Sequence, residues 1–184
     1  MKFIAISQPT FMPWVGYFDL IEQSETFIFL DDVEYSKQSW QQRNRVSCEG
    51  DNWITMPIAK KSSHYKLNEL ALGTDVRACT KLINKIKNVY FKEKYFKLYF
   101  DEIRLILLNG VRNKTSLSEL NIKLIEFFLK ILNISTILTK SSDLMVEGAR
   151  SEKLVNIVNS FDITNYISPP GSAEYLTEDF EIFN

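Results

Sequence analysis

Two short apolar runs lie within the first thirty residues, and a helical pattern separates them. Residues 3–6 are an unbroken hydrophobic stretch of strand length, and 26–30 are four hydrophobic residues after Thr26, which is typical of strands buried on both faces. Residues 13–23 place apolar side chains at steps of four and three, with Pro13 in the first turn, and therefore predict a helix. Strand, helix and strand in this order predict a βαβ unit with parallel strands and a right-handed crossover.

The rest of the chain predicts an α/β fold whose mixed sheet has this parallel core. Residues 40–48 and 53–59 favour two antiparallel strands with a turn at 49–52, and 67–72 favours a short strand. Helices are expected at 75–90, at 95–108 with Asn109-Gly110 as the C-cap, and at 116–132 after the capping box Ser116-x-x-Glu119. A strand at 136–139, a turn at 142–144, a helix at 151–160 and a strand at 165–168 follow. We expect a single domain, 1–184, with an antiparallel excursion and a helical insertion at about 75–132.

Composition and charge restrict the class of protein. The chain has 184 residues, 22 Lys and Arg, and 23 Asp and Glu, for a net charge of −1. A near-neutral chain of this length suits one globular domain and argues against binding duplex nucleic acid through broad electrostatics, although a local basic patch is permitted. No apolar run is long enough to span a membrane, and the apolar start is too short for a signal peptide. The expected location is therefore the cytoplasm.

Cysteine and histidine are too few for a recognisable metal site. Cys48 and Cys79 lack a paired spacing, so both are expected to be reduced structural thiols. His64 is the only histidine and lies in a polar basic loop, where a general-base role is a minor alternative. No glycine-rich phosphate loop and no Gly-x-Ser-x-Gly nucleophile motif is present. We predict no metal site, and the cofactor is unknown.

Three loops carry polar residues that packing does not require. In open α/β sheets, ligands bind where loops leave the carboxyl ends of parallel strands, so we expect these loops to converge on one rim. The first loop is 7–10, leading into residues 14–19, the second is 31–37 and the third is 168–172. The first and third loops supply these candidate substrate-binding residues: Gln8, Thr10, Trp14, Tyr17, Ser168, Gly171 and Ser172. In the third loop, Gly171 would let backbone amides approach an anion.

Asp31 and Asp32 follow the second apolar run and are the candidate catalytic residues. A carboxylate at this position can act as a general base, orient a substrate hydroxyl or amine, or hold magnesium. Because neighbouring residues of a strand point in opposite directions, at most one of the two is expected to face the cleft, and Asp32 is preferred. The alternative is a turn or helix cap, a position that Asp favours for its local hydrogen bonds.

The segment 37–45 has the most unusual composition in the chain. Lys37, Trp40, Arg43, Asn44 and Arg45 are candidate substrate-binding residues. Arg offers paired donors for phosphate or carboxylate, and Trp can stack on a sugar or a base. If 40–48 is a strand, Arg43 and Arg45 share one face and would bind an anionic ligand such as a nucleotide sugar. The alternative is a solvated edge strand whose charges prevent aggregation.

Several of these segments together resemble the WbqC-like protein family. The resemblance rests on Ile6-Ser7-Gln8-Pro9-Thr10-Phe11-x-Pro13-Trp14-x-Gly16-Tyr17-Phe18-Asp19-Leu20-Ile21, Phe29-Leu30-Asp31-Asp32-Val33, Trp40-Gln41-x-Arg43-Asn44-Arg45, Ser141-Ser142 and Tyr166-x-Ser168-Pro169-x-Gly171-Ser172-x-x-Tyr175-Leu176. These segments span nearly the whole chain. Family members usually carry a further C-terminal segment, which we expect to be absent here.

The resemblance implies a role in bacterial surface polysaccharide biosynthesis, including O-antigen and capsule. It suggests a transferase that moves an acyl or aminoacyl group to an amino sugar or nucleotide sugar, with a small anionic molecule as substrate. One alternative is a nucleotidylyltransferase-like enzyme, although 14–17 lacks the histidines that would stabilise a leaving phosphate. Another is a non-catalytic binding or scaffold subunit of the same pathway.

Overall fold

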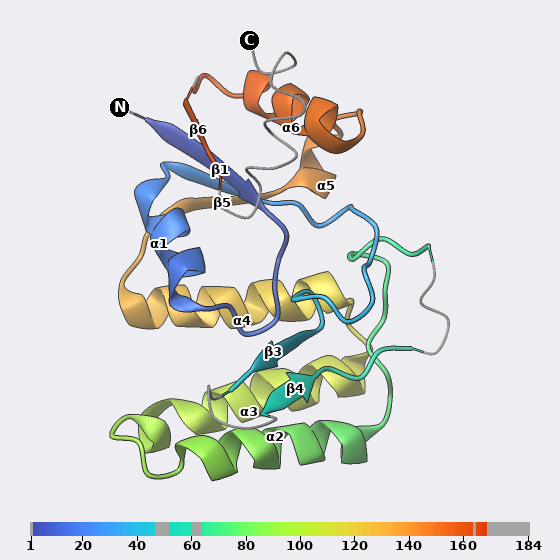
Figure 1. The fold of residues 1–184 in the computed structure, drawn as a ribbon, viewed down its shortest axis with the longest axis vertical. Coiled ribbons are helices and arrows are strands. Elements are labelled where there is room, and N and C mark those ends of the chain that lie inside the picture. Colours follow the sequence, from blue (N-terminus) through green and yellow to red (C-terminus); the bar gives the residue numbers. More distant parts are fainter. Residues whose placement is uncertain (1, 47–51, 60–63, 164, 169–184) are drawn as a thin grey trace. The chain divides into compact units, whose positions relative to one another are not determined.

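The computed structural model describes residues 2–46, 52–59, 64–163 and 165–168 of the chain (Figure 1). By its internal contacts the chain divides into two compact units. We call Met1–Gln8, Trp14–Asp32 and Leu129–Asn184 the sheet unit, and Pro9–Pro13 and Val33–Phe128 the helical unit. The expected single domain with a helical insertion stays a prediction, and each unit is described by itself.

The sheet unit contains a parallel four-stranded sheet of order β5-β2-β1-β6. Its strands are β1 (Phe3–Ser7), β2 (Thr26–Phe29), β5 (Ile137–Lys140) and β6 (Asn165–Ile167). Helix α1 (Val15–Gln23) connects β1 to β2, which confirms the predicted parallel βαβ arrangement. The α/β class is also confirmed, with the antiparallel strands in a separate sheet rather than in this one.

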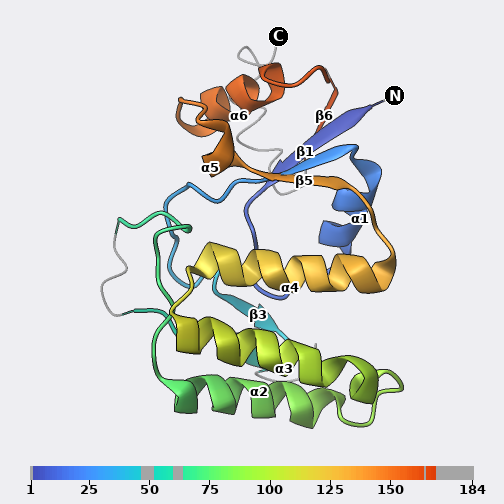
Figure 2. The same cartoon turned by 180° about the vertical axis from the view of Figure 1, so that it is seen from behind.

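Helices cover both faces of the parallel sheet, which explains its unbroken apolar strands. Ile4, Ile6 and Ile28 pack with Leu154 and Ile157 of α6 (Arg150–Asn159). On the other face, the Phe27 ring lies edge-on to Tyr17 of α1 and to Phe29, with ring centroids 5.5 and 5.1 Å away. Figures 1 and 2 show α1 and α6 on opposite sides of the sheet. Because successive strand residues point to opposite faces, consecutive positions of the two central strands are apolar, at 3–6 in β1 and 27–29 in β2.

The helical unit combines an antiparallel strand pair with three helices. Strands β3 (Arg43–Arg45) and β4 (Trp53–Thr55) pair so that Asn44 lies opposite Ile54. Helices α2 (Val76–Tyr90) and α3 (Phe96–Asn113) form an antiparallel hairpin, and α4 (Leu117–Leu132) leads out of this unit. Their inward side chains build one apolar core with β4 and the preceding loops.

Several predicted elements differ in length or type. The strands expected at 40–48 and 53–59 are only three residues each. The first begins late because Gln41 and Gln42 lie in a turn, where their side chains bond to the backbone of Ser36 and Met56. Residues 67–72 form no strand, only isolated bridges at Ala71 and Leu72. Residues 142–144 were expected to turn, but they belong to the short helix α5 (Ser141–Leu144).

Gly110 does not end a helix as predicted. Helix α3 continues to Asn113, and Lys114 in the left-handed conformation is its C-cap. Gly110 is buried inside the helix, where a Cβ atom would lie 2.8 Å from Cδ1 of Leu120 and 3.2 Å from Cδ1 of Leu72. The glycine therefore serves close packing of α3 against its neighbours rather than a turn.

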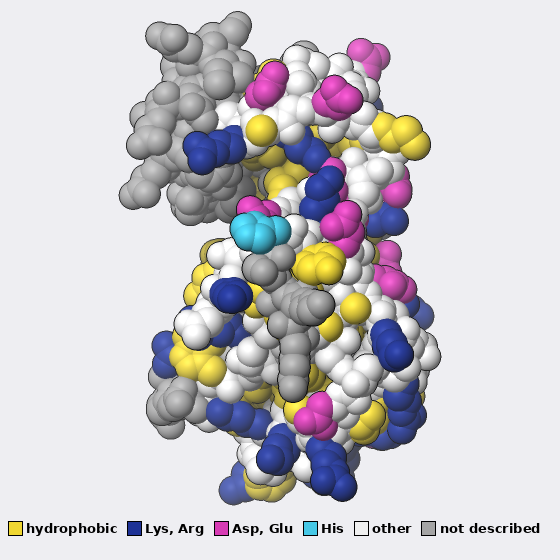
Figure 3. Space-filling model, turned by 90° about the vertical axis from the view of Figure 1, so that its right-hand side faces the viewer, with side chains coloured by type: hydrophobic (Ala, Val, Ile, Leu, Met, Phe, Trp, Pro, Cys, Tyr) yellow, Lys and Arg dark blue, Asp and Glu magenta, His cyan; other side chains and the backbone are white. Residues whose placement is uncertain are grey.

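The two units carry opposite charge. Of the 22 Lys and Arg residues, 17 lie in the helical unit together with 10 Asp and Glu, for a net charge of +7. The sheet unit holds 5 Lys and Arg and 13 Asp and Glu, for a net charge of −8. Figure 3 shows one face, on which Lys and Arg side chains are spread over the helical unit. The near-zero total therefore conceals a basic unit and an acidic unit.

Candidate functional site

The carboxyl edge of the parallel sheet brings two pairs of polar residues together. In the register of β2 and β5, Phe29 lies opposite Lys140, so both strands end at the same edge. Asp31 and Asp32 follow β2, whereas Ser141 and Ser142 follow β5. The Ser141 hydroxyl accepts the Asp31 backbone N–H at 3.2 Å. All four residues lie in the sheet unit, at the edge where open α/β sheets bind ligands.

Asp31 is buried and caps the start of α5. The residue is only 1% exposed. Its Oδ1 accepts the Ser142 backbone N–H at 3.0 Å, and its Oδ2 accepts the Ser142 hydroxyl at 2.8 Å. These bonds satisfy a helix N-terminus that has no internal partners. The contacts of Asp31 are therefore those of the turn or cap alternative.

Asp32 is more accessible and is paired with a lysine from another element. Its side chain is 14% exposed; Oδ1 accepts the Ser141 hydroxyl at 2.5 Å, and Oδ2 forms an ion pair with Lys153 of α6. Burial acts to raise the pKa of Asp32, but the hydrogen bonds from Lys153 and Ser141 and the lysine charge outweigh it and hold this pKa below its ordinary value of 3.8. Asp32 is therefore ionised at neutral pH.

Both carboxylates reach the same serine, which strand alternation does not predict. Ser141 Oγ lies 3.2 Å from Oδ1 of Asp31 and 2.5 Å from Oδ1 of Asp32. Strand β2 ends at Phe29, so the chain has left the extended conformation before the two aspartates. The expectation that they point in opposite directions was wrong for this reason, because alternation holds only within a strand. We call Asp31, Asp32, Ser141, Ser142 and Lys153 the carboxylate cluster.

The chemistry of the cluster follows from the state of Asp32. A carboxylate whose pKa is lowered is a weak proton acceptor at neutral pH, which disfavours a general base. Lys153 already occupies the side of Oδ2, where a cation would otherwise bind. Each Asp32 oxygen keeps a further acceptor position, which suits an N–H or O–H donor of a ligand. Within the described residues, no group of three or more His, Cys, Asp or Glu side chains could hold a metal ion.

The first loop divides into an exposed part and a buried part. Trp14 is 68% exposed, and its ring folds over Gly16, where a Cβ atom would lie 2.1 Å from the indole. Tyr17 is buried, its hydroxyl donates to the Gln8 carbonyl at 3.0 Å, and burial raises its pKa. Thr10 is half-buried and belongs to the helical unit. Of these four candidates, Trp14 has the side chain most open to a ligand.

The segment 37–45 and strand β4 build a cluster of two tryptophans and two arginines in the helical unit. The rings of Trp40 and Trp53 lie 5.4 Å apart, and Trp40 is 54% exposed. The guanidinium carbons of Arg43 and Arg45 lie 4.4 and 5.9 Å from the centre of the Trp53 ring. Among the described residues, the buried Nε of Arg43 has no hydrogen-bond partner. We call Trp40, Arg43, Arg45 and Trp53 the Trp–Arg cluster.

Other residues of this loop are used differently. Asn44 donates to the carbonyls of Phe11 and Met12, at 3.1 and 2.6 Å, and so fixes the 9–13 segment. Lys37 is exposed. Because residues 31–32 of the second loop belong to the sheet unit and residues 33–37 to the helical unit, the expected convergence of all three loops on one rim stays a prediction.

The candidates of the third loop, the two cysteines and the histidine are not members of the carboxylate cluster, and some of them lie outside the described residues. Ser168 is half-buried after β6, whereas Gly171, Ser172 and Cys48 lie outside the described residues. Cys79 is buried, and burial raises the pKa of its thiol to about 11, as suits a structural thiol. His64 is exposed, with Nδ1 3.2 Å from Oε1 of Glu34.

Ser141, Ser142 and Lys153 were not among the sequence-predicted site residues. Ser141 and Ser142 had a usable signal, because they follow a predicted strand and belong to a segment of the family resemblance. Lys153 had none. It precedes Leu154 in an amphipathic helix, where a lysine is ordinarily solvated, and only the placement of α6 on the sheet brings it to Asp32.

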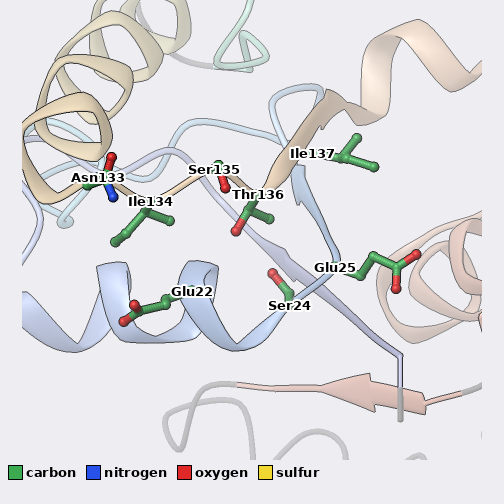
Figure 4. Close-up of a pocket in the computed structure, with 8 residues that line it drawn as sticks. All are labelled: Glu22, Ser24, Glu25, Asn133, Ile134, Ser135, Thr136 and Ile137. Carbon is green, nitrogen blue, oxygen red and sulfur yellow. The ribbon is translucent and has the colours of Figure 1, made fainter.

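A hollow of about 390 Å³ lies at the amino ends of β2 and β5, opposite the carboxylate cluster along the strands. Figure 4 shows its lining residues, which come from the end of α1 and the turn after it, and from the segment between α4 and the start of β5. The hydroxyls of Ser24 and Thr136 both donate to the Ile21 carbonyl, at 2.8 and 2.7 Å, and Glu25 pairs with Lys2. These polar groups support the fold, so this hollow is not our candidate site.

Fold and site together define an α/β protein with a carboxylate cluster at the end of a parallel sheet. The chain belongs to the WbqC-like protein family, which matches residues 8–184. It is also similar to "Uncharacterized protein Rv1507c" of Mycobacterium tuberculosis (strain ATCC 25618 / H37Rv). The two are 35% identical over 181 residues, which cover 97% of this chain and 77% of the relative. No solved structure matches this chain closely enough to support a comparison.

In the part of the chain that the structure describes, no helix is long and apolar enough to cross a membrane.

Proposed function

We propose that this protein is a transferase of bacterial surface polysaccharide biosynthesis, located in the cytoplasm. It moves an acyl or aminoacyl group to the amino group of an amino sugar or a nucleotide sugar. In this reaction the amine nitrogen attacks the carbonyl carbon of the donor, the new C–N bond forms, and the bond to the donor's leaving group breaks. The proton that the amine loses passes to the leaving group, which departs with the electron pair of its bond. Family membership supports this class of reaction, as the resemblance implies it.

The observation that carries the proposal is the state of Asp32. Its carboxylate is ionised, partly accessible, and fixed by Ser141 and Lys153 at the carboxyl edge of the sheet. Such a group binds an amine or hydroxyl through a charge-assisted hydrogen bond. In this proposal Asp32 touches the acceptor and orients its nitrogen toward the donor carbonyl, which raises the rate by positioning. Lys153 and Ser141 are positioning residues that hold Asp32.

The Trp–Arg cluster supports a separate binding site for an anionic group. Trp40 offers an exposed ring on which a sugar or base can stack, and Arg43 has an unpaired buried Nε in the described structure. Buried polar groups nearly always have a partner, so a ligand atom is a reasonable one for this nitrogen. A phosphate or carboxylate would suit the two guanidinium groups.

A ligand screen by thermal shift tests the proposal, because a ligand that binds the folded state raises its apparent stability. The proposal predicts that nucleotide sugars or acyl donors raise the melting temperature. A response to ATP or CTP with magnesium would instead favour the nucleotidylyltransferase alternative, and no response to any of them would favour the scaffold.

The best ligands then enter a transfer assay read by mass spectrometry. We expect Asp32→Asn to lose product formation while the far-ultraviolet circular dichroism spectrum stays unchanged. Asp143→Asn is the matched control, because Asp143 lies nearby on α5 but is exposed and pairs with Lys140. If Asp32→Asn keeps full activity, or if both variants lose it equally, the role proposed for Asp32 is wrong.

For the Trp–Arg cluster, calorimetric titration with the best nucleotide sugar compares wild type, Arg43→Ala, Arg43→Lys and the control Arg77→Ala. Hydrogen bonds to charged groups contribute roughly 1.5–3 kcal/mol, so Arg43→Ala should weaken binding about ten- to a hundredfold. Arg43→Lys keeps the charge but loses the paired donors, and should also weaken binding. Unchanged affinity in both Arg43 variants would show that the arginine only packs on Trp53.

A further inference from the structure

The end of the α2–α3 hairpin combines exposed apolar side chains with lysines. We call residues 87–98 the hairpin tip. Phe91, Tyr95 and Leu98 are 53%, 56% and 69% exposed, respectively. Four lysines in the tip are exposed as well, and Glu93 is its single acidic residue. These lysines are Lys87, Lys92, Lys94 and Lys97.

The lysines lie beside the exposed rings. Lys92 Nζ is 5.5 Å from the centre of the Phe91 ring, and Lys94 Nζ is 5.0 Å from the centre of the Tyr95 ring. Each of these two exposed aromatic rings therefore has a positive charge directly beside it. Figure 1 shows the turn between α2 and α3 projecting past the strand pair β3–β4, and Figure 2 shows it projecting past β3.

The tip is held firmly in this position. The Tyr90 hydroxyl donates to the Val46 carbonyl at 2.6 Å, and Phe96 stacks on Phe100 with centroids 4.5 Å apart. Phe91 N–H and Glu93 N–H donate to the carbonyls of Lys87 and Tyr90. Since local packing already uses Tyr90 and Phe96, the exposure of Phe91, Tyr95 and Leu98 is not explained by the fold.

We propose that the hairpin tip binds the surface of an anionic lipid bilayer. Lysines near such a surface gain electrostatic attraction, and Phe, Tyr and Leu gain by entering the boundary between headgroups and acyl chains. The net charge of +7 on the helical unit adds to this attraction. Nucleic acid fits less well, because the cations of the tip are all lysines rather than arginines, and Leu98 cannot stack on a base. This contact is peripheral and independent of the proposed transfer reaction.

Vesicle flotation tests the proposal with the full chain. Vesicles that contain phosphatidylglycerol and phosphatidylcholine are compared with vesicles of phosphatidylcholine alone. We expect wild type to float only with the anionic vesicles. Lys92→Gln combined with Lys94→Gln should weaken binding about twenty-fivefold, because each lysine near the surface is worth about fivefold. Arg112→Gln combined with Lys114→Gln is the matched control, as it removes the same charge at the other end of α3 and should have a much smaller effect.

The apolar part of the contact needs its own variant. Leu98→Gln should weaken vesicle binding about tenfold, whereas Leu105→Gln, further along the same helix and 41% exposed, should not. Phe91→Trp supplies a fluorescent reporter whose emission should shift to shorter wavelength when anionic vesicles are added.

Three results would overturn the proposal. The first is wild type that does not float with phosphatidylglycerol vesicles, and the second is equal weakening by the control pair and the tip pair. The third is a Leu98→Gln variant that binds vesicles like wild type while single-stranded DNA competes for the lysines. The last result would identify a general polyanion site instead. Circular dichroism of each variant shows whether a loss of binding comes from a loss of fold.

Discussion

At the scale of single residues, the Asp32–Lys153 pair differs from the other ion pairs of the described structure. Its side chains are only 14% and 12% exposed, whereas every other pair has both partners at least 37% exposed. Exposed pairs contribute little to stability, because water screens them. Removing one partner of a largely buried pair leaves an uncompensated charge, which is costly.

A double-mutant cycle should show this difference. We expect Asp32→Asn and Lys153→Met to couple by about 1–3 kcal/mol in the free energy of unfolding, measured by urea denaturation. The exposed Lys140–Asp143 pair, cycled with Lys140→Met and Asp143→Asn, should couple by less than about 1 kcal/mol. Equal coupling in both cycles would contradict a special role for the buried pair.

Stability should also depend on pH through Asp32. The pKa of Asp32 is lower in the folded chain than its ordinary value of 3.8, so the folded state binds fewer protons than the unfolded state between these two values. The contribution is therefore complete above about pH 4 and is lost as pH falls through the folded pKa. Urea denaturation at a series of pH values should show a steeper acid loss for wild type than for Asp32→Asn. Parallel curves would refute this assignment.

At the scale of elements, the N-cap of α2 offers a local test of helix stability. Asp75 accepts the backbone N–H groups of Arg77 and Ala78 at 2.9 and 3.1 Å. Asp75→Ala should lower the free energy of unfolding by about 1 kcal/mol. Asp75→Ser should keep most of this stabilisation, because serine caps a helix nearly as well as aspartate. An alanine variant as stable as wild type would mean that the helix end does not need this cap.

Gly110 tests how tightly α3 is packed. Alanine favours a helix over glycine by about 1 kcal/mol, but the new Cβ would meet Leu120 and Leu72 in a filled core, and overpacking costs about 1–3 kcal/mol. We expect Gly110→Ala to be destabilising. Asn109→Ala, at the exposed neighbouring position, should be neutral or stabilising. The thermal midpoints of the two variants give the comparison, and a stabilised Gly110→Ala would show that the leucines can move aside.

The elements that could be predicted are those with a strong local pattern. Apolar runs set the buried strands β1 and β2, and helical spacing of apolar residues sets helix α2. The cap at Ser116 is set by a side chain that bonds its own turn, because the Glu119 N–H lies 3.1 Å from Ser116 Oγ. The error at Gly110 came from local chemistry that favours a C-cap, whereas the position is decided by contacts with Leu120 and Leu72 from distant segments. The strand predicted at 40–48 was too long because the pattern does not reveal the turn at Gln41 and Gln42, whose side chains bond to the backbone of Ser36 and Met56.

The candidate site was predictable in part. Asp31 and Asp32 stand out because two charges follow a buried strand, and the structure does place them at the carboxyl edge. Lys153 could not be found, because its contact with Asp32 spans 121 positions and depends on how α6 packs. Sequence spacing therefore locates the edge of a sheet better than it identifies the partners that tune a carboxylate.

At the scale of the whole molecule, the separation of charge should govern how the protein meets charged surfaces. The total charge of −1 combines +7 on the helical unit with −8 on the sheet unit. A surface interacts with the nearest part of a molecule, because salt screens charges beyond about 10 Å at 0.1 M ionic strength. The total charge is therefore a poor guide to the binding of this chain.

We accordingly predict that the intact protein binds a cation-exchange resin at pH 7 and low salt, although its isoelectric point of about 5.9 would exclude this for an even distribution of charge. It should also bind an anion exchanger through the sheet unit, and salt should elute it from both. Combining Lys87→Gln, Lys92→Gln, Lys94→Gln and Lys97→Gln should lower the salt needed to elute it from the cation exchanger and leave anion-exchange elution nearly unchanged. Wild type that flows through the cation exchanger would show that the acidic unit dominates, because the basic surface then cannot act on its own.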